Sequence, residues 1–176
     1  MNLFVLRHGK TESNNKKIFN GHYDEDLNDI GVKQIKELLE NINKNEIDLI
    51  ISSPLLRTKH TAEIISNNKI PIIIDDRLIE RNMGELTQKS KDIVDEKLWN
   101  YYSELKFKNL ESMTSICLRI NQLLEEIREK YSDKNVLLVT HAFVTRAINI
   151  YFCGLPKNGD LGDYGLKNGQ LKKYIL

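Results

Sequence analysis

The stretch that decides the fold is MNLFVLRHGKTESN, residues 1–14. Its first six residues form a short apolar run, which is typical of a strand buried on both faces. The run ends abruptly in Arg7, His8 and Gly9. One interpretation is a turn, in which glycine supplies the bend and the polar pair faces water. The other is a reactive histidine at the carboxyl end of a core strand, and the tripeptide alone is too short to decide.

Similar apolar runs recur along the chain and predict further strands. They are rich in β-branched residues, as expected for a largely parallel sheet. These runs are DLIIS (48–52), PIIID (71–75) and NVLLVT (135–140), and LKKYIL (171–176) is a candidate for a last edge strand.

Helical patterns alternate with these strands. Asn28 is a candidate N-cap, and Ser53-Pro54 is a cap followed by proline at the first helical position of a helix that runs to about Asn67. Apolar periodicity predicts three more helices, over 92–106, 111–131 and 142–153. The alternation predicts an α/β fold, a three-layer α/β/α sandwich with a mostly parallel sheet. No linker or repeat interrupts the pattern, so residues 1–176 are expected to form one domain.

Composition limits the classes of partner. The chain has 26 basic and 25 acidic residues and a net charge of +1, which argues against nucleic acid or a membrane surface as the main partner. No apolar run is long enough to span a bilayer, and the first residues lack a signal-peptide pattern, so a cytoplasmic location is expected. Cys117 and Cys153 lie in apolar helical patterns and are interpreted as small buried hydrophobic residues, neither a disulfide nor a metal pair.

The scarcity of arginine gives each arginine more weight. The chain contains 19 Lys and only 7 Arg, so lysine is its default cation. An arginine in such a chain is more often present for its planar fork of donors, which lysine cannot copy.

Four reactive side chains follow the predicted strands. His8 follows the first strand, Arg57 lies one turn into the helix after the second, Glu80 lies just beyond the third and His141 follows the fourth. Ligands of open α/β sheets bind outside the carboxyl ends of the strands, so these residues converge at one edge. Each has a simpler interpretation: Arg57 as a solvated helix residue, Glu80 as a partner of Arg81, His141 as a helix cap. Their shared placement favours a site.

Two histidines, two arginines and a glutamate suit phosphoryl transfer. Guanidinium groups offer bidentate donors to a phosphoryl group, and Gly9 would let backbone N–H groups approach it. A histidine can form a phosphohistidine, a second can stabilise the transferring group, and a carboxylic acid can protonate the departing alkoxide. No metal is required, and neither HxH nor HExxH spacing occurs among the four histidines.

Several segments together resemble the histidine phosphatase superfamily, in its phosphoglycerate-mutase-like branch. RHGKTESN is similar to the family signature, and the resemblance continues in order along nearly the whole chain. The other matching segments are NGHYDEDLNDIGVKQ, SSPLLRTKHTA, RLIERNMGEL, ESMTSICLR and VLLVTHAFVTR. Lys10 and Ala142 depart from residues common in the family, at positions not expected to take part in the chemistry.

The resemblance implies a role for each matching residue. His8 is the nucleophile and Glu80 the proton donor, while Arg7, Arg57 and His141 form the phosphate pocket. Asn14, Asn20 and Gly21 match positions near the phosphate or substrate, and Arg81 follows the acid as in many members. The resemblance also implies a sheet of about six strands and no cofactor.

The resemblance thus implies a metal-independent phosphatase that hydrolyses phosphomonoesters of small metabolites. Two alternatives are a mutase of the phosphoglycerate mutase type and a non-catalytic phosphate-binding module. The short stretch 85–110, with five lysines and no arginine, favours hydrolysis over mutase chemistry. The variable stretch 87–109 carries no readable motif, so the sequence does not indicate the substrate. His22 is equally compatible with a substrate contact and an exposed loop position, and the oligomeric state is not readable.

Overall fold

The computed structural model describes residues 1–43 and 46–176. Within this part of the chain, five strands form one sheet in the order β3-β2-β4-β1-β5, where about six strands were expected. The last strand pairs with β1 antiparallel, and the other pairings are parallel. The predicted mostly parallel sheet with a C-terminal edge strand is therefore confirmed. The strands are β1 (Asn2–Arg7), β2 (Leu49–Ser52), β3 (Ile72–Ile74), β4 (Val136–Thr140) and β5 (Leu171–Ile175).

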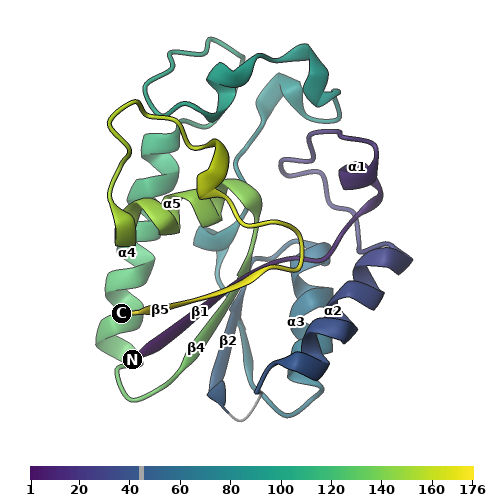
Figure 1. The fold of residues 1–176 in the computed structure, drawn as a ribbon, viewed down its shortest axis with the longest axis vertical. Coiled ribbons are helices and arrows are strands. Elements are labelled where there is room, and N and C mark those ends of the chain that lie inside the picture. Colours follow the sequence, from purple (N-terminus) through teal and green to yellow (C-terminus); the bar gives the residue numbers. More distant parts are fainter. Residues whose placement is uncertain (44–45) are drawn as a thin grey trace.

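Helices cover both faces of the sheet, as the predicted three-layer sandwich requires. Helices α4 and α5 pack on one face and α2 and α3 on the other (Figure 1). A short helix, α1, follows the first strand directly. The bounds are α1 (Glu12–Asn15), α2 (Asp29–Asn41), α3 (Leu56–Ser66), α4 (Met113–Lys130) and α5 (Ala142–Cys153).

The hydrophobic core is divided by the sheet into two layers because successive side chains of a strand point to opposite faces. In β1, Leu3 and Val5 face the α4–α5 layer, whereas Phe4 and Leu6 face the α2–α3 layer. All four are buried, so the middle of the strand is apolar on both faces. The predicted stripe of α4 supplies the outer wall of the first layer, with Ile116, Ile120, Leu123, Leu124 and Ile127 all buried.

The starts of α2 and α3 can be compared with the N-caps that the sequence predicted. Asn28 caps α2, since its side chain accepts a hydrogen bond from Gly31 N. Helix α3 begins at Leu56, three residues after Ser53, and its N-cap position Leu55 forms no side-chain capping bond. Pro54 and Leu55 instead form the bend that precedes the helix, and the Ser53 hydroxyl accepts a long hydrogen bond from Leu55 N (3.5 Å).

The predicted helix over 92–106 is wrong. Two short 3₁₀ turns, Lys91–Ile93 and Glu96–Trp99, occur there instead, and residues 103–106 have no regular structure. The backbone of this segment bonds to a distant loop, with Tyr101 N donating to Gly159 O and Trp99 O accepting from Leu161 N. These long-range bonds replace the local ladder of a helix, so the segment crosses the top of the molecule as an irregular cover (Figure 1).

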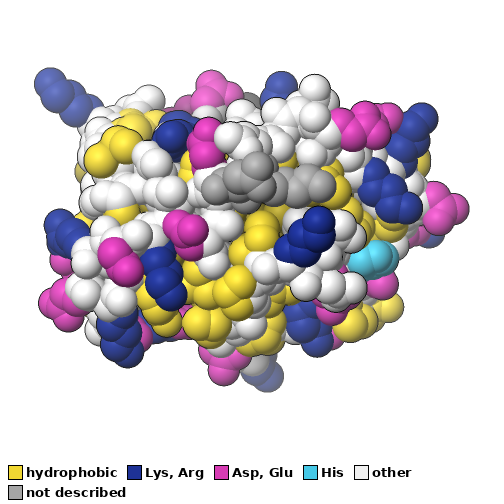
Figure 2. Space-filling view, turned by 90° about the horizontal axis from the view of Figure 1, so that it is seen from below, with side chains coloured by type: hydrophobic (Ala, Val, Ile, Leu, Met, Phe, Trp, Pro, Cys, Tyr) yellow, Lys and Arg dark blue, Asp and Glu magenta, His cyan; other side chains and the backbone are white. Residues whose placement is uncertain are grey.

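The predicted burial of the cysteines is only partly correct. Cys117 on α4 is half-buried, and Cys153 at the end of α5 is exposed. Both thiols are free. Figure 2 shows the face around the amino ends of the parallel strands, where basic and acidic side chains alternate with hydrophobic ones and neither charge dominates.

Candidate active site

The loop after β1 holds His8 in a defined orientation. The backbone N–H of His8 donates to Thr140 O (3.0 Å), which ties the loop to β4. The ring atom Nδ1 lies 2.7 Å from Gly9 O. A carbonyl oxygen only accepts, so Nδ1 carries the proton and Nε2 keeps its lone pair. His8 is 3% exposed and lines a pocket at the carboxyl end of the sheet, so it presents an unprotonated Nε2 there.

Gly9 has a different role from the predicted one. Its N–H donates to Thr61 Oγ1 (3.2 Å), so it is not offered to a phosphoryl group. A Cβ atom at Gly9 would lie 2.8 Å from Gly31 O and 2.9 Å from a carbon of Ile35. Glycine is therefore required for close packing of the nucleophile loop on α2, and Gly9 lies outside the pocket lining.

Arg7 lines the pocket, and its guanidinium has one buried donor without a partner among the described residues. Its NH1 group donates to Leu166 O (2.9 Å), whereas its buried Nε has no hydrogen-bond partner among the described residues. Burial is the main cause that lowers the pKa of Arg7 to about 10. A buried guanidinium with an unused N–H favours an anion as its partner.

Arg57 and His141 form a buried pair behind the nucleophile. Arg57 Nε donates to His141 Nδ1 (3.3 Å), and the two terminal nitrogens of Arg57 donate to Tyr23 O and Gly21 O (2.9 Å each). Because His141 Nδ1 accepts, its proton is on Nε2 and is donated to Ser53 Oγ (2.7 Å). Arg57 lines the pocket, but His141 does not. His141 thus supports Arg57, and its ring centroid lies 5.1 Å from that of His8, so its predicted contact with the phosphate stays a prediction.

Glu80 is fixed by two backbone N–H groups. Its Oε1 accepts from Arg81 N (2.9 Å) and from Phe143 N (3.1 Å) near the start of α5, and the side chain lines the pocket at 9% exposure. The Arg81 guanidinium points elsewhere, donating to Glu111 O and Leu98 O. Arg81 therefore contributes its main chain to the site, in place of the predicted substrate contact.

The first loop places its polar residues at the pocket. Asn14, Asn20 and Gly21 all line it, as predicted for positions near the substrate. Asn20 Nδ2 donates to Glu25 Oε1 (2.6 Å), which fixes that amide. Burial raises the pKa of Glu25, but hydrogen bonds from neighbouring groups, Asn20 among them, outweigh it and the net shift is downward. His22 Nε2 donates to Glu80 O (2.8 Å), so this exposed histidine braces the acid segment.

Burial and the neighbouring cations both favour the neutral form of His8. Burial is the main cause that lowers the pKa of His8 well below its ordinary value, and the charges of Arg57 and Arg7 lower it further. Burial also lowers the pKa of Arg57 and Arg146, and the charge of Glu80 opposes this shift in both. The pocket therefore combines a neutral nucleophile with an excess of cations.

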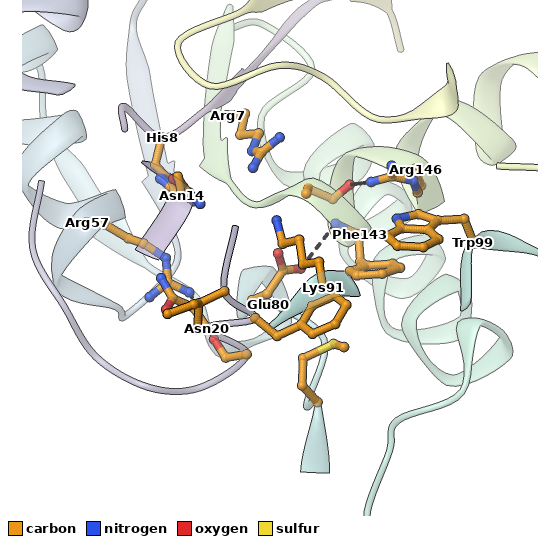
Figure 3. Close-up of a pocket in the computed structure, with 15 residues that line it drawn as sticks. Arg7, His8, Asn14, Asn20, Arg57, Glu80, Lys91, Trp99, Phe143 and Arg146 are labelled. Atoms are coloured by element: carbon orange, nitrogen blue, oxygen red, sulfur yellow. Dashed lines mark hydrogen bonds between the residues drawn. The ribbon is translucent and has the colours of Figure 1, made fainter. Parts of the chain in front are cut away.

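Figure 3 shows how these side chains surround one pocket. His8, Asn14 and Arg57 lie on one side, Trp99, Phe143 and Arg146 on the other, and Glu80 and Lys91 between them. Cations, a carboxylic acid and a histidine base around one cavity can bind a phosphate ester, accept its phosphoryl group and protonate its leaving oxygen. In the described part of the chain, no three His, Cys, Asp or Glu residues are grouped so that they could hold a metal ion.

Comparison with protein families agrees with this geometry. Residues 3–173 match the model of the histidine phosphatase superfamily, branch 1. The chain belongs to the histidine phosphatase superfamily. The predicted family is thus confirmed, and a phosphatase is the class of enzyme.

Two curated members of the superfamily are similar over most of the chain. Phosphoserine phosphatase 1 of Hydrogenobacter thermophilus is 32% identical over 161 residues, covering 87% of this chain and 75% of the relative. A probable phosphoglycerate mutase of Escherichia coli is 32% identical over 164 residues, covering 89% and 76%. These two relatives are therefore equally similar to the chain in sequence identity and nearly so in coverage.

Two solved structures of phosphatases share the fold. A mycobacterial glucosyl-3-phosphoglycerate phosphatase superposes with a TM-score of 0.83 at 24% identity, covering 98% of this chain and 91% of that one. The α-ribazole phosphatase of Shigella flexneri gives 0.82 at 24% identity, covering 98% and 89%. These likenesses confirm the predicted α/β architecture.

Sequence reasoning missed several residues of this histidine phosphatase site. Arg146, one turn into α5, could have been found from the scarcity of arginine, because three of the seven arginines line the pocket. Lys91, Trp99 and Phe143 also line it, and the first two come from the cover that was predicted to be helical. Ser53 was interpreted as a helix cap, and only the structure reveals its bond to His141.

Proposed function

We propose that residues 1–176 form one metal-independent histidine phosphatase domain that hydrolyses phosphomonoesters through a phosphohistidine at His8 Nε2. The observation that carries this proposal is the hydrogen bond from His8 Nδ1 to Gly9 O, which leaves Nε2 as the free base. Arg7, whose side chain lines the same pocket, supplies a charged donor for the phosphoryl group. A neutral nucleophile beside a group of cationic side chains is the arrangement that phosphoryl capture requires.

In the first step, the lone pair of His8 Nε2 forms a bond to phosphorus while the bond from phosphorus to the ester oxygen breaks. The electron pair of the broken bond goes to that oxygen, which takes a proton from the Glu80 carboxylic acid and leaves as an alcohol. Arg7, Arg57 and Asn14 donate hydrogen bonds to the equatorial oxygens, and His141 keeps Arg57 in place. Glu80 is left as a carboxylate.

In the second step, water attacks phosphorus and gives its proton to the Glu80 carboxylate. The bond between phosphorus and Nε2 breaks, its electron pair returns to His8, and inorganic phosphate leaves. Two backbone N–H bonds hold Oε1 of Glu80 in one place, so the same group serves both steps. Asn20, held by Glu25, contributes to the substrate side of the pocket.

The pocket beyond the phosphate favours a small leaving group. Phe19, Met83, Trp99 and Phe143 give it an apolar wall, with the Phe19 and Trp99 rings 6.4 Å apart. Lys91 is the one lysine of the described cover that lines the pocket, and burial lowers the pKa of its ammonium group. We therefore propose small phosphorylated metabolites as substrates.

Hydrolysis is favoured over mutase chemistry because few cations are available for a second anionic group. Each nitrogen of the Arg146 guanidinium donates to a backbone carbonyl, namely Leu161 O, Ala142 O and Gly162 O. Of the five lysines in the described stretch 85–110, only Lys91 lines this pocket, and its Nζ lies 5.7 Å from the centroid of the Phe19 ring. The similarity to a probable phosphoglycerate mutase keeps the mutase as the second candidate function.

The test is to incubate the protein with 3-phosphoglycerate, with and without 2,3-bisphosphoglycerate, and to follow isomerisation and free phosphate together. We expect phosphate release to exceed isomerisation and to persist in EDTA. Isomerisation much faster than phosphate release would establish the mutase, and loss of turnover in EDTA would contradict metal independence. A panel that includes phosphoserine, sugar phosphates and nucleotides, assayed in parallel, ranks the substrates.

We expect a cytoplasmic enzyme without nucleic-acid or membrane partners. The net charge of +1 and the intermixed charges of the face in Figure 2 support this expectation. No helix in the described part of the chain is long and apolar enough to cross a membrane. Retention on a heparin or DNA column at physiological salt would argue against it.

A further inference from the structure

The loop that precedes β5 contacts the nucleophile loop through the side chain of Asn168. Its Nδ2 atom lies 3.1 Å from His8 O, 3.0 Å from Asn14 Oδ1 and 3.4 Å from Gly9 O. These partners lie more than 150 residues earlier in the chain. A single amide group thus connects the C-terminal loop to both the nucleophile and a pocket-lining asparagine.

Asn168 is itself held firmly at its backbone. Gln34 Nε2 of α2 donates to Asn168 O (2.6 Å). The next residue, Gly169, donates its N–H to Arg7 O (3.0 Å) and His8 O (3.2 Å). The Asn168 side chain therefore starts from a fixed point, and its amide has little freedom to turn away from the nucleophile loop.

The consequence appears at Asn14, which lines the pocket on the side of His8 (Figure 3). Its Oδ1 accepts two hydrogen bonds, from Thr11 N (3.2 Å) and from Asn168 Nδ2 (3.0 Å). Turning this amide over would bring its NH₂ group against two donors, which is unfavourable. The oxygen is therefore kept out of the pocket, and the NH₂ group, which has no protein partner among the described residues, is left to face it.

We propose that Asn168 is a positioning residue that fixes the Asn14 amide so that its NH₂ group donates to the phosphoryl oxygens. Asn168 does not line the pocket, so it acts through Asn14 and not on the substrate. An Asn14 amide turned the other way would present an oxygen to an anion and repel it. This inference rests on the proposed function, because it assigns the donor to a phosphate site.

A role in folding alone makes a different prediction. Asn168 also braces the carbonyls of His8 and Gly9, so removing its side chain is expected to lower the unfolding midpoint under either account. Only a positioning role changes the affinity of the folded protein for a phosphate analogue. If Asn168 acts through Asn14, the effect of Asn168→Ala on that affinity disappears when the Asn14 side chain is absent.

The experiment compares the wild type with Asn14→Ala, Asn168→Ala and the double variant, using vanadate as the phosphate analogue and p-nitrophenyl phosphate as substrate. We expect Asn168→Ala to raise the vanadate inhibition constant at least about 10-fold, as for a lost hydrogen bond to a charged group. In the Asn14→Ala background, the same change is expected to alter that constant by less than about 2-fold. All assays are run well below the measured unfolding midpoints.

Asn168→Asp provides a second variant of nearly the same size, in which an oxygen replaces the NH₂ group. It is expected to weaken vanadate binding at least as much, because Asn14 would turn its own NH₂ toward the new carboxylate. Asn158→Asp is the matched control: it adds the same charge in an exposed loop, where Oδ1 continues to accept from Asp160 N. It should bind vanadate as the wild type does.

An unchanged vanadate constant in folded Asn168→Ala or Asn168→Asp would overturn the inference. So would equal effects of Asn168→Ala in both backgrounds. A wild type that neither hydrolyses the substrate nor binds vanadate would instead overturn the proposed function, and the inference with it. The two failures are thus distinguished by the behaviour of the wild type.

Discussion

Arg57 donates its Nε–H to Nδ1 of His141 across 3.3 Å, at the base of the pocket that His8 lines. A guanidinium only donates, so this bond fixes the tautomer of His141 and directs its remaining N–H to Ser53. The ring centroids of His8 and His141 are 5.1 Å apart, so the pair lies next to the nucleophile. Arg57 therefore links α3 to the end of β4 and carries a fixed cation to the phosphate site.

Replacement of Arg57 by lysine tests whether its fork of donors matters beyond its charge. We expect Arg57→Lys to lower kcat/KM for p-nitrophenyl phosphate about 100-fold and to weaken vanadate binding, because an ammonium cannot hold His141, two carbonyls and a phosphate together. Arg128→Lys, on the solvent side of α4, is the control. If kcat/KM and vanadate binding of Arg57→Lys match those of Arg128→Lys, Arg57 takes no part in phosphate binding or catalysis.

Glu80→Gln separates the acid role from simple binding. The first chemical step should slow by roughly 10²-fold or more for alkyl phosphates, whose alkoxide needs a proton, and much less for p-nitrophenyl phosphate. Pre-steady-state bursts are required, since the second step also uses Glu80 and steady-state rates fall for both substrates. Glu63→Gln, exposed on α3, serves as control. Equal burst rates for both esters in wild type and variant would remove Glu80 from the acid role.

The burial of His8 predicts an unusual pH profile. The nucleophile acts as the neutral base, and burial together with Arg57 and Arg7 lowers its pKa below the ordinary value of 6.5. Protonation therefore occurs only at more acidic pH, and the acid limb of kcat/KM should lie well below pH 6.5 once substrate ionisation is corrected for. Arg57→Gln removes a neighbouring cation and should move that limb to higher pH. A limb at or above pH 6.5 in the wild type would contradict this environment.

Close packing of α2 on the nucleophile loop predicts a stability effect at Gly31. A Cβ atom there would lie 2.1 Å from Lys10 O, a backbone atom that cannot move alone. Gly31→Ala should lower the free energy of unfolding by about 1–3 kcal/mol, although alanine is the better helix former. Gly162→Ala, where the nearest atom is a flexible Asp160 oxygen at 3.2 Å, should change it little. Urea unfolding measures both, and an unaffected Gly31→Ala would mean that the contact relaxes freely.

The sequence predicted the frame well because apolar runs and caps are local signals. The runs at 135–140 and 142–153 appear as β4 and α5 almost without change, and Asn28 caps α2 as expected. The convergence of His8, Arg57 and Glu80 followed from the topology of a parallel sheet alone. The sequence could therefore predict the strand after which each of these residues lies.

The sequence could not predict interactions that depend on distant backbone groups. The cover at 92–106 has helical periodicity, but Tyr101 N bonds to Gly159 O and the helix does not form. Asn168-Gly169 has the composition of an ordinary turn, and its contacts with His8 and Asn14 have no local signature. Gly9 was interpreted as a position that lets backbone N–H groups approach a phosphate, because its close contact with Gly31 of α2 cannot be inferred from spacing.

The most direct test of the account is the capture of the phosphoryl group on His8. The protein is mixed with excess p-nitrophenyl phosphate at neutral pH, quenched within milliseconds under alkaline conditions that preserve phosphohistidine, and analysed by peptide mass spectrometry. We predict one acid-labile phosphoryl group, on His8, in wild type and in His60→Ala, and none in His8→Ala, whose turnover falls at least about 10³-fold. Turnover without a phosphoryl adduct, or near wild-type turnover in His8→Ala, would contradict the covalent mechanism.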